Sequence, residues 1–115
     1  MVLWIGFDLQ AEIEAVDGNN CTALHLASNY GKEAVAAQLL QAGASVIAVD
    51  DYGRTPLHWA ARNGKSSIAN LLLQANASPT AVDKDGYTTA QRAKRQGHGD
   101  LAARLLEAEQ AAALK

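Results

Sequence analysis

The sequence has few of the residues that build a disulfide framework, a membrane span or a large aromatic core. One cysteine among 115 residues excludes a disulfide network and fits a reducing, intracellular compartment, either cytoplasmic or nuclear. No run approaches the roughly 20 apolar residues of a membrane span, and the apolar opening MVLWIGF lacks the length and basic start of a secretion signal. Aromatic residues make up 5% of the chain against 49% hydrophobic residues, and alanine is abundant. This balance favours closely packed helices.

The charge balance argues against nucleic acid and membrane partners. The formal net charge is −2, so no overall field draws the protein to polyanions. The charges are uneven, because residues 1–17 are acidic with no lysine or arginine and residues 84–104 are mainly basic. A basic aromatic groove of Arg62, Arg95 and Tyr30 is a weaker nucleic-acid alternative, which steeply salt-dependent binding would revive.

One segment recurs along the chain with a fixed period. Residues 55–65 read TPLHWAARNGK, residues 22–32 read TALHLASNYGK, and residues 88–98 read TTAQRAKRQGH. The same spacing of 33 separates several single residues, namely Asp17, Asp50 and Asp83, and Gly31, Gly64 and Gly97. Paired leucines also recur at 39–40, 72–73 and 105–106. A period of this length predicts a stacked array of small units, because one unit cannot bury its own apolar face.

Each repeat predicts two helices and a turn-rich connection. Thr55 is suited to cap a helix, Pro56 fits its first turn, and Gly64 supplies a left-handed stop. A second helix follows, with a buried stripe at Ile68, Leu71 and Leu72. Left-handed backbone is also predicted after the second helix, at Gly43 and Asn76, and at the tips of the connections, at Asn20, Gly53 and Gly86.

These motifs resemble the ankyrin repeat family. The resemblance rests on TALHLASNYG, TPLHWAARNG, the paired leucines and AGASVIAVD at residues 42–50, and it covers residues 17–108. It implies an all-α solenoid of stacked antiparallel helix pairs joined by β-hairpin-like loops, the fingers. We expect one domain over residues 1–115. It divides into an N-terminal half-repeat (1–16) and three repeats (17–49, 50–82 and 83–115), of which the last is also the C-terminal cap.

The two ends depart from the repeat in different ways. In the last copy, polar Gln91, Arg92 and Lys94 replace residues of the motif, which we expect on an outer face that meets no further repeat. At the front, residues 6–17 align with 39–50, so the chain begins at the second helix of a repeat. Three interpretations stay open. The chain is a fragment of a longer array, or it begins with a natural half-repeat cap, or Trp4 and Phe7 form a weak homodimer surface.

The sequence offers little for catalysis or cofactors. His25 and His58 hold equivalent places one repeat apart, and the resemblance implies hydrogen bonds to threonine and loop groups. His98 has a similar structural interpretation. Cys21 lies at a finger position with no catalytic partners in its sequence context, so a reactive thiol is an unsupported alternative. No phosphate loop or zinc spacing appears, and we expect neither an enzyme nor a bound cofactor or metal.

The residues that vary between copies are the candidate binding residues. The resemblance implies that finger tips and first-helix surfaces line a concave face that binds a protein. Tyrosine and arginine are enriched in interface hot spots, although ordinary solvated surface is the alternative for each residue. The predicted site comprises Asn19, Tyr30, Asp51, Tyr52, Arg54, Arg62, Asn63, Lys84, Tyr87, Arg95 and Gln96, with Gly18, Cys21, Asn29 and Asp85 beside them.

The basic third copy suggests that the protein partner carries an acidic patch. The rival hypothesis is that the module is a structural spacer or regulatory segment of a longer protein, which associates with itself through its apolar N-terminal helix.

Overall fold

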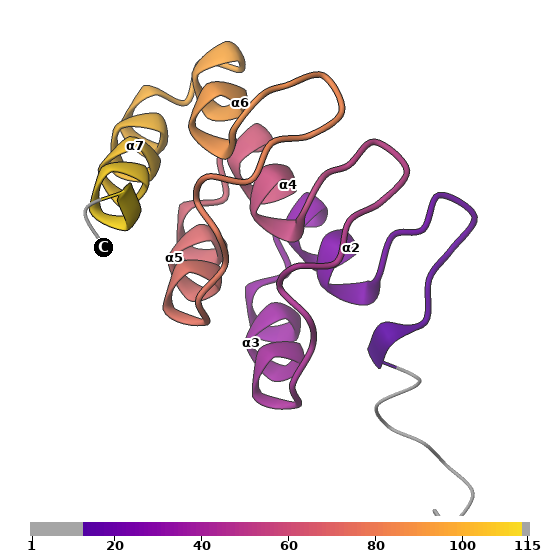
Figure 1. Cartoon of the computed structure of the whole chain (residues 1–115). Helices are drawn as coiled ribbons and strands as arrows, with labels where there is room; N and C mark the ends of the chain where they lie inside the picture. Colours follow the sequence, from indigo (N-terminus) through magenta and orange to yellow (C-terminus); the bar gives the residue numbers. More distant parts are fainter. Residues whose placement is uncertain (1–12, 114–115) are drawn as a thin grey trace, which may run out of the picture.

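The computed structural model describes residues 13–113, and there the helices form three pairs (Figure 1). The pairs are α2 (Ala23–Tyr30) with α3 (Glu33–Gln41), α4 (Pro56–Arg62) with α5 (Ser66–Gln74), and α6 (Thr89–Arg95) with α7 (Gly99–Ala113). No β-strand occurs in this range. The predicted all-α stack of helix pairs is therefore confirmed.

The first helix of each pair begins at a threonine that caps it. The Thr55 hydroxyl accepts a hydrogen bond from the His58 backbone N–H (3.3 Å), and the His58 ring accepts one from the Thr55 backbone N–H (3.2 Å). Thr22 with His25, and Thr88 with Gln91, form the same reciprocal pair. Each reciprocal pair thus satisfies two backbone N–H groups that the helix leaves free, and the predicted cap is confirmed.

The predicted left-handed positions are also confirmed. After the first helices, Gly31, Gly64 and Gly97 have φ of 71°, 69° and 83°. Gly64 has a second constraint, because a Cβ there would lie 2.7 Å from the His98 ring. The other predicted left-handed positions also have positive φ: Asn20, Gly43, Gly53, Asn76 and Gly86.

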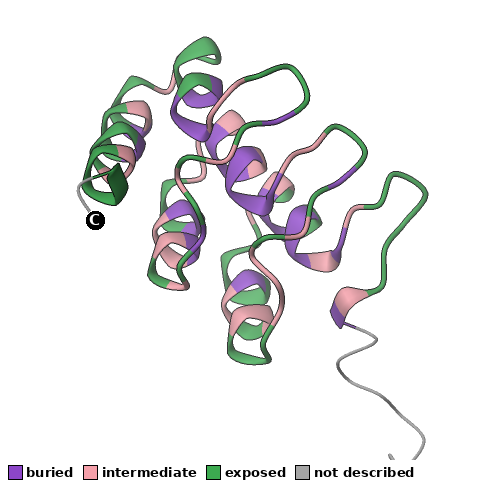
Figure 2. Cartoon of the chain, viewed as in Figure 1, coloured by how far each residue is buried: buried purple, intermediate pink, exposed green. Residues whose placement is uncertain are grey.

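The core runs along the row of first helices. α4 packs between α2 and α6, and α3 packs on α5, so buried residues concentrate along α2, α4 and α6 (Figure 2). Leu57, Ala60 and Ala61 of α4 are fully buried, and the alanines let neighbouring helices approach closely. In α5, Ile68 and Leu72 are buried as predicted, whereas Leu71 is only half-buried.

The fingers project from one side of the stack and contact one another (Figure 1). They are finger 1 (residues 17–21), finger 2 (residues 50–54) and finger 3 (residues 83–87). Each is closed by a backbone hydrogen bond between its ends, from Asp50 N to Arg54 O (3.1 Å) in finger 2. Neighbouring fingers are joined by Asp51 N to Asn19 O (3.0 Å) and by Lys84 N to Tyr52 O (3.0 Å). The finger backbones therefore form a continuous, ordered row.

Several predictions about the ends lie outside the described residues. The apolar segment with Trp4 and Phe7, and most of the half-repeat assigned to residues 1–16, fall in this category. The boundaries between repeats stay a prediction. In the last copy, Gln91 and Lys94 are exposed, as expected for an outer face.

Candidate protein-binding face

The predicted site residues lie in two rows along the stack. One row is on the fingers: Asn19, Asp51, Tyr52, Arg54, Lys84 and Tyr87. The other is at the C-terminal ends of the first helices: Tyr30, Arg62, Asn63, Arg95 and Gln96. We call the surface that carries both rows the concave face.

The aspartate at the start of each finger holds the finger in shape. One oxygen of Asp50 accepts hydrogen bonds from the backbone N–H groups of Tyr52 (2.9 Å) and Arg54 (3.0 Å). Asp17 and Asp83 make the same two bonds in their own fingers. The sequence showed the period of these aspartates, but not this role. The period was the available signal, since a carboxylate that accepts two backbone hydrogen bonds is hard to replace.

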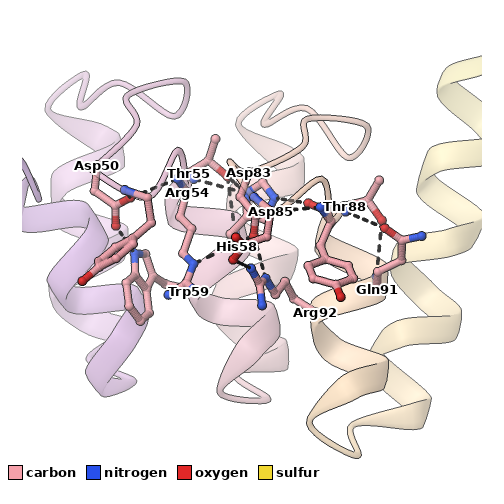
Figure 3. Close-up of polar contacts among 12 residues, drawn as sticks. Asp50, Arg54, Thr55, His58, Trp59, Asp83, Asp85, Thr88, Gln91 and Arg92 are labelled. Carbon is pink, nitrogen blue, oxygen red and sulfur yellow. Dashed lines mark hydrogen bonds and ion pairs between the residues drawn. The ribbon is translucent and has the colours of Figure 1, made fainter.

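In the second and third repeats, the second oxygen of this aspartate binds a side chain from the first helix of the same repeat (Figure 3). Trp59 donates its indole N–H to Asp50 (2.8 Å). Arg92, nine residues after Asp83, donates Nε–H to Asp83 (2.6 Å) and an Nη2 hydrogen to Asp85 (2.9 Å). The side chains at 59 and 92 thus connect fingers 2 and 3 to the first helices of their own repeats.

The prediction for Arg92 is therefore wrong. We expected this arginine among the tolerated polar residues of an outer face, but it is buried and paired with two carboxylates. Position 92 lies on the side of α6 that faces its own finger, where the Asp83 carboxylate needs a donor. A charge at this position completes a buried polar network.

Arginine–aromatic stacking covers part of the predicted site. The Arg54 guanidinium lies over the rings of Tyr52 (5.1 Å) and Trp59 (4.8 Å), and its side chain is only 13% exposed. The Arg62 guanidinium also lies over the Trp59 ring, at 5.5 Å from its centre, and the Arg95 guanidinium lies over the Tyr87 ring at 4.7 Å. Arg54 thus mainly stabilises the fold, whereas Arg62 and Arg95 remain accessible to a partner.

A hollow on the concave face brings several predicted residues together. It has a volume of about 310 Å³ and lies between finger 1, α2 and the second repeat. Its walls include the predicted residues Asn19, Tyr30 and Tyr52, with Cys21 and Asn29 beside them. Asn63 is not part of these walls, but its amide donates to the Asn29 backbone carbonyl (3.1 Å).

Four lining residues of this hollow are not among the predicted binding residues. Asp17 belongs to the repeat period and His25 has a predicted structural role, whereas Leu26 and Trp59 were missed altogether. They occupy the same place in successive repeats as Arg92. The signal was present in the sequence, because this repeat position changes from leucine to tryptophan to arginine, which is an unusual variation.

The two motif histidines are structural, as predicted. His58 donates from Nε2 to the Tyr87 carbonyl (3.0 Å) of the next finger, and His25 does the same to the Arg54 carbonyl (2.8 Å). Burial lowers the pKa of His58 below its ordinary value, against the opposing effects of the Tyr87 carbonyl and Asp83. His58 is therefore neutral near pH 7 and bridges two repeats.

Cys21 is expected to be a slow nucleophile. Burial and the carboxylates of Asp17, Asp50 and Asp51 raise the pKa of its thiol to about 11. At pH 8 we expect iodoacetamide to alkylate the native protein on the order of 100-fold more slowly than the urea-unfolded chain, because the thiolate is the reactive species.

The rate of Cys21 alkylation, followed by mass spectrometry from pH 7 to 11, checks this prediction. Asp51→Asn removes one carboxylate charge near Cys21 and leaves the bonds that Asp50 makes to finger 2 and Trp59 in place, so it should speed the reaction. Equal rates in the native and unfolded chains would contradict the expectation and revive the reactive-thiol alternative.

Two further properties concern the described part of the chain. No helix there is long and apolar enough to cross a bilayer. Residues 13–113 also contain no group of three or more histidine, cysteine or acidic side chains placed to hold a metal ion.

Comparison with known proteins identifies the family. The family model described as ankyrin repeats, in three copies, matches residues 2–83. This match covers most of the 115 residues and ends at Asp83, before α6 and α7. No curated protein matches the sequence. The helix pairs, the threonine caps and the fingers agree with this match, and the chain belongs to the ankyrin repeat family.

Proposed function

We propose that this protein is a non-enzymatic module that binds another protein through its concave face. Ankyrin repeats are generally protein–protein interaction modules and are typically not enzymes. The observation that supports this face is the pair of exposed tyrosines at the hollow, Tyr30 (66% exposed) and Tyr52 (55% exposed). Exposed tyrosines beside a hollow are typical anchors of a protein interface.

The hydrogen bonds between fingers and between repeats favour binding without rearrangement of the backbone. The finger backbones are joined to one another, and His25 and His58 bridge successive repeats. Contact residues that are already ordered lose less conformational entropy on association. We therefore expect the partner to dock on a preformed surface.

The charges suggest that part of the partner is acidic. Arg92 is neutralised by Asp83 and Asp85, so it contributes little to the surface. Arg62, Arg95 and Lys84 remain accessible on the concave face. An acidic patch on the partner would meet these cations, and such rim charges act mainly on the rate of association.

Affinity capture from cell extract tests the proposal. The wild type is compared with Arg62→Glu/Arg95→Glu and with Tyr30→Ala/Tyr52→Ala, each checked for helicity and thermal midpoint. The control is Lys32→Glu/Arg104→Glu, which reverses two charges outside the concave face. A protein captured by the wild type and the control, but lost from both concave-face variants, is the expected result.

A spacer role in a longer stack is the second candidate, and the outer face of α6 and α7 favours it. A hollow of about 390 Å³ there is lined mainly by apolar groups, including Ala90, Ala102 and the exposed Leu106. Equal capture by the wild type and both concave-face variants would favour this role.

A further inference from the structure

We propose that the hollow beside Asp17 receives an arginine side chain of the protein partner. This inference rests on the proposed function, since it names the chemistry of one contact on the concave face. The occupant is inferred from the other two repeats, which fill the equivalent place with their own side chains.

The third repeat provides the template. There the Arg92 guanidinium lies against the second oxygen of Asp83 (2.6 Å) and over the Tyr87 ring (4.6 Å). A planar guanidinium is suited to this arrangement, because it pairs with a carboxylate at its edge and stacks on an aromatic ring with its face.

The first repeat has the acceptor of this arrangement but no donor. Its equivalent of Arg92 and Trp59 is Leu26, which has no polar group and is 38% exposed in the wall of the hollow. One oxygen of Asp17 accepts the Asn19 and Cys21 N–H groups (2.9 and 3.0 Å). The second oxygen accepts no hydrogen bond from residues 13–113. Within the described part of the chain, this carboxylate oxygen therefore has no donor at the place that Trp59 and Arg92 fill in the other repeats.

The walls favour a cation that can stack. Tyr30, Tyr52 and Trp59 line the hollow, and aromatic faces attract cations. Arg54 already lies over the rings of Tyr52 and Trp59, so Tyr30 is the wall on which no arginine of residues 13–113 stacks. The Cys21 thiol lies close to several carboxylates, and burial and the charges of Asp17, Asp50 and Asp51 together raise the pKa of this thiol to about 11. The same carboxylates favour a cation over a neutral side chain in the hollow.

The nearby cations do not occupy this place. Arg54 and Arg62 both lie over the Trp59 ring, and Arg54 Nε is 3.9 Å from Asp83 in the next finger. Neither forms an ion pair with Asp17 among the described residues. The volume of about 310 Å³ lies at the lower end of ligand pockets, roughly 300–1,000 Å³, and suits one side chain.

Small arginine derivatives test the pocket directly. The probes are N-acetyl-arginine amide and the apolar control N-acetyl-norleucine amide, whose unbranched alkyl side chain has no guanidinium, and each is titrated to tens of millimolar against ¹⁵N-labelled protein. The arginine probe should shift the amides of Cys21, Leu26 and Tyr52 in a saturable way, and the norleucine probe should not. Absence of saturable shifts, or equal shifts with both probes, overturns the inference.

Two variants locate the interaction. Asp17→Asn keeps the oxygen that accepts the two backbone hydrogen bonds of finger 1 but removes the charge. We expect this variant to bind the arginine probe about fivefold more weakly. Glu107→Gln removes one exposed carboxylate on α7 and should have no effect. Leu26→Arg supplies the missing donor from within the chain and should abolish probe binding, whereas Leu26→Met should not. Unchanged probe binding in Asp17→Asn or in Leu26→Arg would contradict the pocket.

Capture of a partner separates this inference from the proposed function. A partner lost from Leu26→Arg but kept by Leu26→Met supports an arginine in the pocket. A partner captured equally by both, yet lost from Arg62→Glu/Arg95→Glu, leaves the proposed function standing and overturns the pocket as part of it. Saturable arginine binding to a protein that captures no partner overturns the proposed function and supports the pocket chemistry alone.

Discussion

Leu57→Ala is expected to lower the free energy of unfolding by about 3 kcal/mol. The Leu57 side chain is fully buried in α4, the helix that packs between α2 and α6. Truncation leaves a cavity in the middle of the stack. Because repeats of this kind are stabilised by contacts with their neighbours, damage to the central interface weakens the whole domain.

Urea unfolding followed by circular dichroism measures this loss, and Leu106→Ala is the matched control. Leu106 is 47% exposed on α7, so its truncation should cost less than about 1 kcal/mol. Similar losses in the two variants would contradict the placement of the core in the row of first helices.

Arg92→Leu is expected to cost about 3 kcal/mol as well, through electrostatics. The substitution places in the third repeat the residue that the first repeat has at position 26. The Asp83 side chain, which has no exposed surface, would then lose its closest cation. Removing one partner of a buried ion pair leaves the other charge desolvated and poorly compensated.

Arg92→Trp is the control for this variant, because Trp59 donates to Asp50 at the equivalent place. Chemical unfolding at pH 7 should show a clearly smaller loss for Arg92→Trp than for Arg92→Leu. Equal losses would mean that packing around position 92, and not the donor to Asp83, determines its contribution.

The same ion pair predicts the direction of a pH dependence. Burial alone would raise the pKa of Asp83, but the hydrogen bonds from Arg92 and from the Tyr87 N–H and the Arg92 charge outweigh it, so the pKa lies below its ordinary value. This contribution to stability is complete above about pH 4, the ordinary range of aspartate, and is lost as the pH falls through the folded-state pKa. In Arg92→Leu, acid destabilisation should begin at a higher pH than in the wild type.

Much of the fold was predictable because it depends on short stretches of chain. Thr55 caps a helix through His58, three residues away, and Gly64 adopts a conformation that other residues avoid. These requirements are local and recur with the period. The error at Arg92 has the opposite origin. Its partner Asp83 is nine residues away, and a motif comparison shows that position 92 differs without showing what it faces.

The candidate site was predictable in outline only. Variation between copies marked the fingers and helix ends, and the structure places these residues in two rows of one face. Variation did not show that the Arg54 guanidinium lies over the rings of Tyr52 and Trp59, or that one carboxylate oxygen of Asp17 accepts no hydrogen bond from residues 13–113. Both facts depend on which side chains fill the space between repeats.

The bridges made by His25 and His58 bear on how such a protein grows in evolution. Both histidines donate to a main-chain carbonyl of the next finger, at Arg54 and Tyr87. A carbonyl is present whatever side chain that finger carries. A gene duplication that adds one whole repeat of 33 residues therefore gives every new junction its acceptor, in register, with no compensating substitution. The tips can then diverge toward new partners while the junctions stay intact.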